Sequence, residues 1–512
     1  MSLPSEGARP LARIALGALR GVTDATADDG TAAAPVHAFL GIPFAQPPMG
    51  PLRWQGPRPP QAWDGERDAS RFGPDCTQAA NPRLRGDGMG EDCLYLNVWT
   101  PAGATGDTQA RLPVMVWVHG GGFVGGSGSD VRTYGADMAR QGVVLVSFNY
   151  RPGLFGFLAH PALSAESAQG VSGNYGLLDQ LAALGWVRDH IAAFGGDPSR
   201  VTVFGVSAGS ASISLLLGCA HARGLFQQAI LHSPGAGRPL ASLEDATRAG
   251  SALGSDIAEL RRLDAASLFA RTSELNPKVR GLTTPRLLRP IQDGWLIPKD
   301  ERAALLAGHF NAMPMIVGSN TDEGTLLTRE WPLSKLADYT ALMQNNFGPK
   351  SPEAIRLYPA VNDSQARPAI AALFGDTQFN YGVRLLARAM SARNQPVWRY
   401  LFNRRRPEQT DGPHHGDEVA HVFGTLQRTF GISAGNNQPN FDEADRSLSR
   451  QMMGAWARFA TTGNPNGPGL ADWPAYEPAA DNYRMMDWPL GQGSRWRETE
   501  LDFLDRYFDA QA

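Results

Sequence analysis

A serine between glycines stands where a strand-like run gives way to a helix-like one. The residues Gly205–Gly209 read G-x-S-x-G, with Ser207 at the centre, after the apolar run Val201–Phe204 and before the helical pattern Ala211–Leu217. Such a turn is so tight that the neighbours of the serine must lack bulk, and it exposes the hydroxyl at the end of the strand. A turn without chemistry is the alternative, because the chain has 57 glycines. In this context the pattern predicts that Ser207 is a nucleophile for acyl transfer.

A second glycine cluster could supply the hydrogen-bond donors that this chemistry needs. The run Pro113–Val118 leads directly into His119-Gly120-Gly121-Gly122-Phe123. Acyl transfer passes through a tetrahedral intermediate whose oxygen is negatively charged, and backbone N–H groups can bind that oxygen. We expect the donors to be the N–H groups of Gly121, Gly122 and Ala208. A flexible loop is the alternative, but two glycine-rich turns after two buried strands together favour an enzyme.

Spacing alone narrows the choice of base and acid without settling it. In enzymes with this serine turn the order along the chain is serine, acid, histidine. The candidate acids are Asp322 and Glu323, after the apolar run Pro314–Val317, and the candidate bases are His414, His415 and His421, after Val397–Phe402. Both segments lie at the carboxyl ends of predicted strands, where open parallel sheets carry their catalytic groups. Surface histidines and solvated carboxylates remain the alternatives.

The elements that must position these residues read as a parallel sheet with helices around it. Apolar runs that do not alternate with polar residues are typical of strands covered on both faces. Helical patterns separate several of them, for example Leu177–Phe194, and strand–helix alternation predicts a mostly parallel sheet. The predicted strands are Pro113–Val118, Val143–Phe148, Val201–Phe204, Ala229–Leu231, Pro314–Val317 and Val397–Phe402.

The chain is predicted to be one α/β domain over residues 1–512. Two connections between strands are too long for simple crossovers and look largely helical, so we expect insertions at about 235–311 and 325–396 that cover one end of the sheet. Glu301–Ala307 and Val383–Arg393 are examples of their helical patterns. The polar, small-residue segments Thr26–Pro35 and Gly431–Asn440 are expected to be surface loops.

Bulk properties exclude several classes of function. The net charge is −3, from 47 basic and 50 acidic residues, so nucleic acid is not expected as a partner. No apolar run approaches the length of a membrane span, and the N-terminus lacks the apolar stretch of a secretory signal. We expect a protein inside the cell, or one whose signal has been removed. No histidines and carboxylates have metal-ligand spacing, and His119 beside the glycines is expected to be structural.

At this point the chain resembles the type B carboxylesterase family, which includes cholinesterases and bacterial para-nitrobenzyl esterases. The resemblance runs over nearly the whole length and implies the α/β-hydrolase fold, a small-molecule ester as substrate and no cofactor. It leaves open whether the protein is a monomer or a homodimer. Besides the glycine loop, the motifs that carry it are Phe39–Pro48, Glu91–Asn97, Asn149–Arg151, Gly173–Gln180, Phe194–Pro198 and Thr462–Asn466.

The resemblance implies roles that spacing could not assign. The acid of the family matches Glu323, and its catalytic histidine matches His415 before Gly416. Ser233 matches a serine that supports the acid. Structural ion pairs are implied for Arg53 with Glu91 and for Arg151 with Asp179, and a disulfide for Cys76 with Cys93, which leaves Cys219 unpaired.

Two departures argue against cholinesterase activity. The glutamate that usually precedes the nucleophile is Val206, and the Cys76–Cys93 loop contains no Trp, Tyr or Phe. A quaternary ammonium group would find neither its carboxylate nor its aromatic face there. The implied reaction is acyl transfer through an acyl-enzyme on Ser207. Other possibilities are an amide or carbamate hydrolase with the same site, or a non-catalytic binding protein on the same fold.

Three further segments are similar to bacterial fumonisin esterases, which remove tricarballylic acid side chains from an aminopolyol toxin. They are Arg238–Leu243, Ser255–Arg262 and Phe374–Asn380. An acyl group with two free carboxylates requires cationic recognition, for which Arg238, Arg280, Arg286 and Arg289 are candidates. Solvated surface arginines are the alternative. The residues expected in the substrate pocket are Phe123, Val206, Ser233, Arg238, Arg286 and Phe379.

Overall fold

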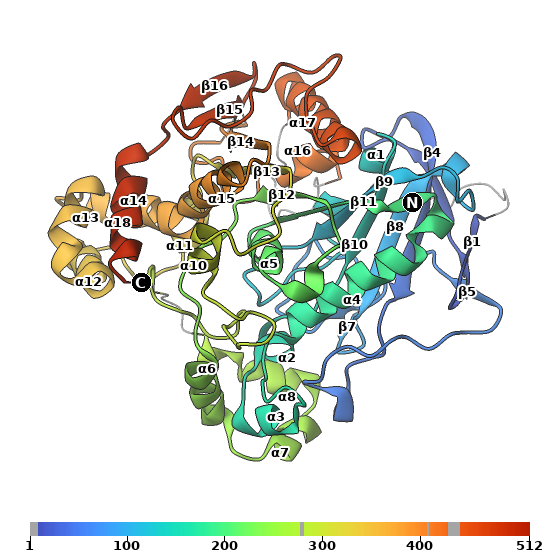
Figure 1. Cartoon of the computed structure of the whole chain (residues 1–512), viewed down its shortest axis with the longest axis horizontal. Helices are drawn as coiled ribbons and strands as arrows, with labels where there is room; N and C mark the ends of the chain where they lie inside the picture. Colours follow the sequence, from blue (N-terminus) through green and yellow to red (C-terminus); the bar gives the residue numbers. More distant parts are fainter. Residues whose placement is uncertain (1–8, 277–280, 407–408, 429–440, 512) are drawn as a thin grey trace.

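A large sheet runs through the middle of the molecule (Figure 1). The computed structural model describes residues 9–276, 281–406, 409–428 and 441–511, and the sheet within them has 11 strands. From one edge to the other the strands are β16 (Gly491–Ser494), β15 (Asn482–Met486), β14 (Val397–Phe402), β13 (Met315–Asn320), β12 (Gln228–His232), β11 (Gly196–Val206), β9 (Leu112–Val118), β10 (Val144–Phe148), β8 (Tyr95–Pro101), β4 (Ala32–Pro43) and β3 (Val22–Thr26).

The centre of the sheet is parallel and both of its ends are antiparallel. Neighbouring strands run parallel from β10 through β9, β11, β12, β13 and β14 to β15. The pairs β3–β4, β4–β8, β8–β10 and β15–β16 are antiparallel. All six predicted strands are present in the parallel part, so the expected α/β-hydrolase fold is confirmed. The outer antiparallel strands were missed.

Helices cover both faces of the sheet, as its apolar strands require. Along β9, Val114, Val116 and Val118 pack into the core on one face, whereas Met115 and Trp117 pack into the core on the other. The first core includes residues of α4 (Tyr175–His190), α5 (Ala208–Leu217) and α15 (Tyr381–Ala392), and the second includes residues of α1 (Ala136–Ala139), α16 (Val419–Phe423) and α17 (Glu443–Thr462). The helix predicted over Leu177–Phe194 corresponds to α4 followed by a 3-10 turn over Ile191–Phe194.

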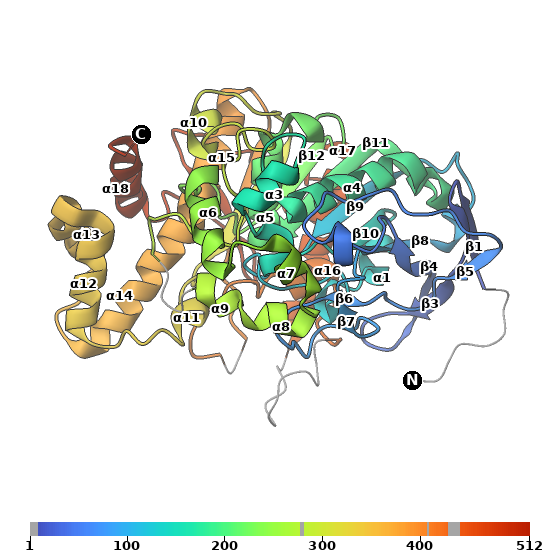
Figure 2. The same cartoon turned by 90° about the horizontal axis from the view of Figure 1, so that it is seen from below.

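The two long connections contain short helices. The helices between β12 and β13 lie at the bottom of Figure 1, except for α10. The helices between β13 and β14 extend to the left of that view, beside the last helix of the chain (Figures 1 and 2). The first group is α6 (Leu243–Gly250), α7 (Ile257–Arg262), α8 (Ala265–Ala270), α9 (Thr272–Leu275) and α10 (Glu301–Leu306). The second is α11 (Thr325–Thr328), α12 (Leu336–Phe347), α13 (Ser351–Leu357), α14 (Asp363–Gly375), a π turn over Asp376–Asn380 and α15, and the last helix is α18 (Glu498–Asp509).

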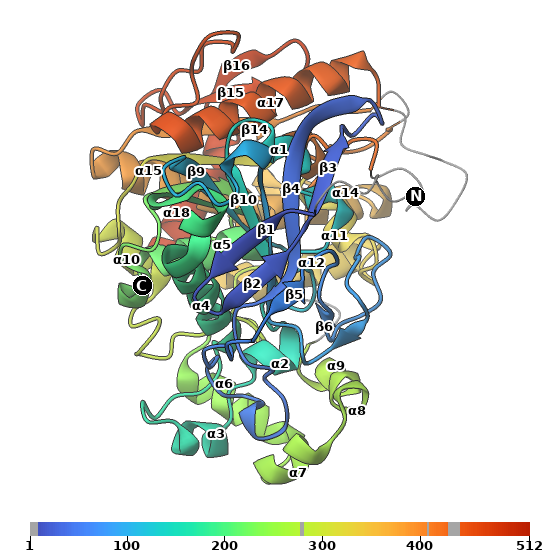
Figure 3. The same cartoon turned by 90° about the vertical axis from the view of Figure 1, so that its right-hand side faces the viewer.

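The N-terminal part adds small elements beside the sheet. A separate three-stranded sheet of β1 (Leu11–Ile14), β2 (Gly17–Arg20) and β5 (Glu66–Asp68) is drawn in blue in Figure 3. The remaining elements are β6 (Asp75–Cys76), β7 (Met89–Gly90), α2 (Gly153–Phe157) and α3 (Pro161–Glu166). The loop predicted over Thr26–Pro35 was partly wrong, because β4 already begins at Ala32 and pairs with β3. The loop predicted over Gly431–Asn440 lies outside the described residues.

The cysteines and two ion pairs agree with the resemblance. Cys76 and Cys93 form a disulfide, and Cys219 is a buried free thiol. The buried pairs are Arg53–Glu91, with a nitrogen–oxygen distance of 2.5 Å, and Arg151–Asp179, at 2.7 Å. Among the described residues, no helix is both long and apolar enough to cross a membrane.

Candidate active site

Ser207 occupies a strained turn between β11 and α5. Its backbone has φ 58° and ψ −122°, a left-handed conformation that costs a non-glycine residue about 1–3 kcal/mol. A Cβ atom on Gly209 would lie 2.0 Å from the carbonyl oxygen of Val118, so only glycine fits there. The Ser207 N–H donates to the His232 carbonyl at 2.9 Å. The G-x-S-x-G pattern recurs at 431–435, outside the described residues.

His415 and Glu323 come together from two neighbouring strands. His415 Nδ1 lies 2.5 Å from Glu323 Oε2, and the other carboxylate oxygen accepts hydrogen bonds from Ser233 Oγ at 2.5 Å and from the Asn320 N–H at 2.7 Å. Burial lowers the pKa of His415, but the Glu323 carboxylate outweighs it, so that the pKa lies above its ordinary value. Nε2 of His415 has no hydrogen-bond partner within the described residues. It is therefore the ring atom able to exchange a proton with Ser207, which lines the same cavity.

The neighbouring candidates are engaged elsewhere. The Asp322 carboxylate accepts hydrogen bonds from the N–H groups of Thr325 and Gly412, both at 3.1 Å. His414 Nε2 lies 3.3 Å from Asp411, and His421 Nε2 lies 3.5 Å from Asp445. The geometry thus separates Glu323 from Asp322, and His415 from the other two histidines, which spacing could not do.

The glycine loop borders the same cavity. Gly121 has φ 116° and Gly122 has φ 64°, and a Cβ on Gly121 would lie 2.1 Å from the Gly125 carbonyl oxygen. Both glycines line the cavity together with Ala208 at the start of α5. His119 is buried, stacks on Tyr150 with ring centroids 4.1 Å apart, and its burial lowers its pKa to about 4. A neutral, packed imidazole of this kind is structural rather than catalytic.

The cavity around Ser207 and His415 has a volume of about 1190 Å³. Aromatic side chains line part of it, namely Trp331, Phe374, Phe379 and Phe441. Phe379 stacks on the His415 ring with centroids 4.3 Å apart, and Val206 also faces the cavity. Ser233 was expected to line the cavity, but it does not. It is fully buried, and its hydroxyl donates a hydrogen bond to Glu323. Its pocket assignment was therefore wrong.

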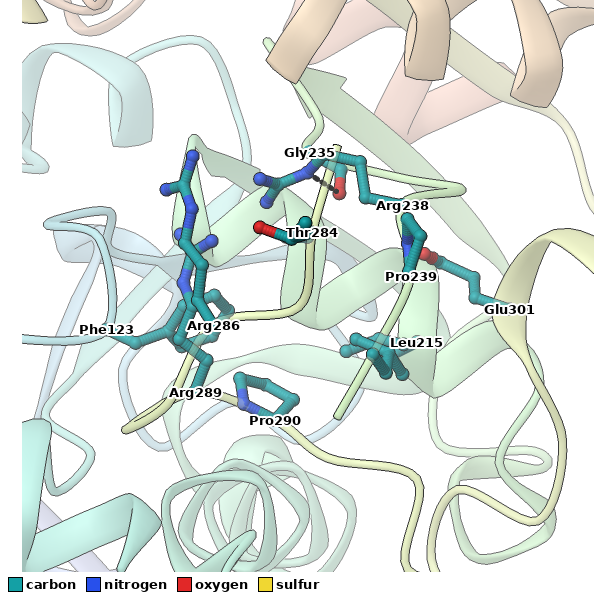
Figure 4. A pocket seen from close by; sticks show the side chains of 12 residues that line it. Phe123, Leu215, Gly235, Arg238, Pro239, Thr284, Arg286, Arg289, Pro290 and Glu301 are labelled. Atoms are coloured by element: carbon teal, nitrogen blue, oxygen red, sulfur yellow. Dashed lines mark hydrogen bonds between the residues drawn. The ribbon is translucent and has the colours of Figure 1, made fainter. Parts of the chain in front are cut away.

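A recess of about 30 Å³ adjoins the main cavity and carries three arginines, which line both spaces. In Figure 4 the guanidinium groups of Arg238, Arg286 and Arg289 gather on one side of the recess, whereas Glu301 lies on the other. Arg289 stacks over Phe123 at 5.2 Å. Burial raises the pKa of Glu301 to about 7, although hydrogen bonds from Ser214 and Gly237 oppose this rise. Arg280, the fourth candidate, lies outside the described residues.

A second buried carboxylate stands behind the candidate triad. Glu418 is fully buried, three residues after His415 and just before α16, and its Oε2 accepts a hydrogen bond from Asn320 Nδ2 at 2.7 Å. Asn320 Nδ2 also donates to the His414 carbonyl, and its N–H holds Glu323. His232 Nδ1 lies 3.5 Å from Glu418, and His232 Nε2 accepts a hydrogen bond from the Trp456 N–H. Sequence patterns offered no signal for this arrangement, since a glutamate in a loop is usually solvated.

The comparisons with known proteins agree with this geometry. A sequence profile described as the carboxylesterase family matches residues 8–504. The chain is 46% identical to a fumonisin B1 esterase of Sphingopyxis macrogoltabida, over 86% of this chain and 82% of that protein. It is 34% identical to a para-nitrobenzyl esterase of Bacillus subtilis (strain 168), over 90% and 92%. A solved PNB esterase structure superposes with a TM-score of 0.81 and 32% identity, over 96% of this chain and 99% of that one.

Proposed function

Because this chain belongs to the carboxylesterase family and is a carboxylic-ester hydrolase, we propose that Ser207 is its nucleophile, His415 its base and Glu323 its supporting acid. The observation that carries the proposal is the 2.5 Å contact of Glu323 with His415 Nδ1, which leaves Nε2 without a hydrogen-bond partner within the described residues, while His415 and Ser207 line one cavity. The donors for the oxyanion are the N–H groups of Gly121, Gly122 and Ala208, which border that cavity.

The reaction has two steps. His415 Nε2 takes the proton of the Ser207 hydroxyl as the oxygen attacks the ester carbonyl, and the imidazolium then gives that proton to the leaving alcohol. Water attacks the acyl-enzyme by the same route and releases the acid. The Glu323 carboxylate holds the proton on Nδ1 and stabilises the imidazolium, which agrees with the raised pKa of His415, where the carboxylate outweighs burial.

The test is covalent labelling of the native enzyme with an organophosphate, followed by peptide mapping. We expect one label per chain, on the peptide that contains Ser207, and loss of both label and turnover in Ser207→Ala with an unchanged melting temperature. A label on Ser433, in the second G-x-S-x-G pattern, would contradict the assignment.

A specific observation favours a second, narrower function. Arg238, Arg286 and Arg289 line the recess that opens beside Ala211 and Gly235, two residues that also border the main cavity. We propose that the acyl group lies in the main cavity, which these three arginines also line, and that it carries free carboxylates, as tricarballylate does. The 46% identity to a fumonisin B1 esterase supports a substrate of that type. Guanidinium groups suit carboxylates because their donors match both oxygens.

Steady-state kinetics on two esters of the same alcohol test the narrower function. The native enzyme should hydrolyse a tricarballylate monoester with a higher kcat/KM than a neutral ester of similar size, and free tricarballylate should inhibit competitively. The preference should weaken as salt is raised from 0.05 to about 0.5 M, because salt screens charges. Equal kcat/KM values would leave only a general carboxylesterase.

We also propose that residues 1–512 work as one domain, with insertions at about 235–311 and 325–396. The continuity of the sheet from β3 to β16 supports this, since it joins strands from near the beginning and near the end of the chain.

A further inference from the structure

The π turn Asp376–Asn380 brings two consecutive side chains to the active-site cavity. Gln378 and Phe379 both line it. In a regular α-helix consecutive side chains point about 100° apart, so neighbours rarely face the same space. Single π turns inside α-helices occur frequently at functional sites. Phe379 stacks on the His415 ring, which leaves the contacts of Gln378 to be explained.

Hydrogen bonds hold the turn in place from behind. The Asp376 carboxylate is fully buried and accepts from Asn380 Nδ2 at 2.8 Å, from the Tyr358 hydroxyl at 2.8 Å and from Arg497 Nε at 2.5 Å. Asn380 in turn accepts from Ser319 Oγ on β13 at 2.7 Å. The turn is therefore tied both to the sheet and to the segment before α18, so that Gln378 has a fixed backbone.

The amide of Gln378 can point only one way. Its Nε2 donates to the Leu282 carbonyl at 2.9 Å and to Thr377 Oγ1 at 3.2 Å, so its oxygen faces the opposite side. That oxygen accepts hydrogen bonds from both Arg238 and Arg286. Gln378 is 2% exposed, which limits any rearrangement of its side chain. One neutral oxygen thus gathers two guanidinium groups that come from different parts of the first insertion.

We infer that Gln378 is a specificity-determining residue, which presents Arg238 and Arg286 together to a carboxylate of the acyl group. The inference rests on the proposed preference for anionic acyl groups. Two guanidinium groups close together repel each other, so an acceptor must hold them. An amide oxygen does this without cancelling their charge, whereas a carboxylate at the same position would form ion pairs with them. A thioether of similar size would fill the space without accepting their hydrogen bonds.

The experiment compares Gln378→Glu and Gln378→Met with the native enzyme on two probes. One probe is mono-4-nitrophenyl glutarate, whose acyl chain ends in a carboxylate, and the other is neutral 4-nitrophenyl hexanoate. The quantity measured is the ratio of kcat/KM for the anionic probe to that for the neutral one. Gln492→Glu is the matched control, since Gln492 is exposed on β16 at the edge of the sheet and undergoes the same change of charge.

We expect Gln378→Glu to lower the ratio by about tenfold or more, mainly through a higher KM for the glutarate, because like charges placed together are unfavourable. Gln378→Met should lower it by a smaller factor, and Gln492→Glu should leave it within about twofold. Melting temperatures identify a variant that does not fold. If one of the two Gln378 variants does not fold, the other one tests the inference, because the inference predicts a lower ratio for both.

The outcomes separate the inference from the function on which it rests. A native preference for the glutarate that survives in a folded Gln378→Glu or Gln378→Met variant would overturn the role of Gln378 and leave the anionic preference intact. Absence of a preference in the native enzyme would overturn both. A preference that is lost in the Gln378 variants and kept in Gln492→Glu would establish the inference.

Discussion

The proposed triad and the arginine recess share one cavity but belong to different parts of the fold. Ser207 and Glu323 follow parallel strands directly, and His415 stands in the loop beyond β14. Arg238, Arg286 and Gln378 come from the long connections that contain the short helices. This difference predicts that the reaction depends on the strands of the sheet, whereas the preference for one substrate over another depends on the long connections. Substitutions in the two regions should therefore affect different measured quantities.

The largest effect is expected in the triad and should not depend on the substrate. Glu323→Gln should lower kcat by about 10³- to 10⁴-fold on both anionic and neutral esters, because an amide favours the wrong tautomer of His415. Asp322→Asn is the matched control. It should cost less than about tenfold, since Asp322 accepts backbone N–H groups and does not contact the histidine. Equal losses would remove the distinction between the two neighbours.

In the recess the effect should depend on the substrate. Arg286→Ala and Arg238→Ala should each lower kcat/KM for an anionic ester by about 30-fold or more, since truncating a partner of a buried charged contact costs roughly 2 kcal/mol or more. A neutral ester should be affected far less. Arg388→Ala, which removes a cation that pairs with Asp505 away from the cavity, serves as the control. Equal losses on both esters would mean that the arginines, like the triad, affect the reaction itself and not the preference between substrates.

Choline esters test the charge of the whole cavity. Among the described residues, six arginines line it, namely the three of the recess with Arg83, Arg132 and Arg406, against three carboxylates, Asp130, Glu330 and Asp417, and Val206 adds no further carboxylate. A quaternary ammonium substrate should therefore be poorer than a neutral aryl ester by about tenfold in kcat/KM. The aromatic side chains of the cavity could in principle bind such a cation. Selective hydrolysis of acetylcholine over an aryl acetate would mean that they outweigh the arginines.

The smallest expected effect is on the pH dependence of activity, which Glu418 influences from its position behind the triad. His415 must be neutral to act as a base, so activity rises as the pH passes its pKa. Burial lowers that pKa, Glu323 and Glu418 raise it, and Arg132 lowers it. Glu418→Gln keeps an acceptor for Asn320 but removes the charge, so the acid limb of kcat/KM should move to lower pH, by less than about one unit.

A matched change separates this effect from a general loss of charge. Asp417→Asn removes the charge of the residue that precedes Glu418. The Asp417 side chain is 28% exposed, so solvent should screen its charge, and the acid limb of kcat/KM should shift less than in Glu418→Gln. Glu418→Ala, which also loses the contact with Asn320, should lower kcat in addition. An acid limb that moves to higher pH in Glu418→Gln would contradict the proposed influence of Glu418 on His415.

The sequence was sufficient to predict the type of reaction and the location of most strands of the parallel sheet. Strands buried on both faces read as uninterrupted apolar runs, so Val397–Phe402 was predicted with its observed bounds, whereas β11 and β13 extend beyond their predicted ranges, β11 as far as Gly196 and β13 as far as Asn320. The strands β3, β4, β15 and β16 were missed because they are partly exposed and carry polar or small residues, and β8 was missed although it is mostly buried, because Asn97 and Thr100 interrupt its apolar run. The loop expected over Thr26–Pro35 was partly wrong, because β4 pairs with β3 and so begins at Ala32, and no local pattern shows that pairing.

What the sequence determined by itself is the chemistry that local motifs encode. Ser207 and the glycine loop were predicted from the turns that follow two strands, because steric demands at a tight turn act on adjacent residues. Only the tertiary structure decided which distant groups meet. It separated Glu323 from Asp322, buried Ser233 behind the acid and joined Arg238 to Arg286 through Gln378. Contacts between residues more than 90 positions apart depend on how the connections fold back over the sheet, and no local pattern specifies that.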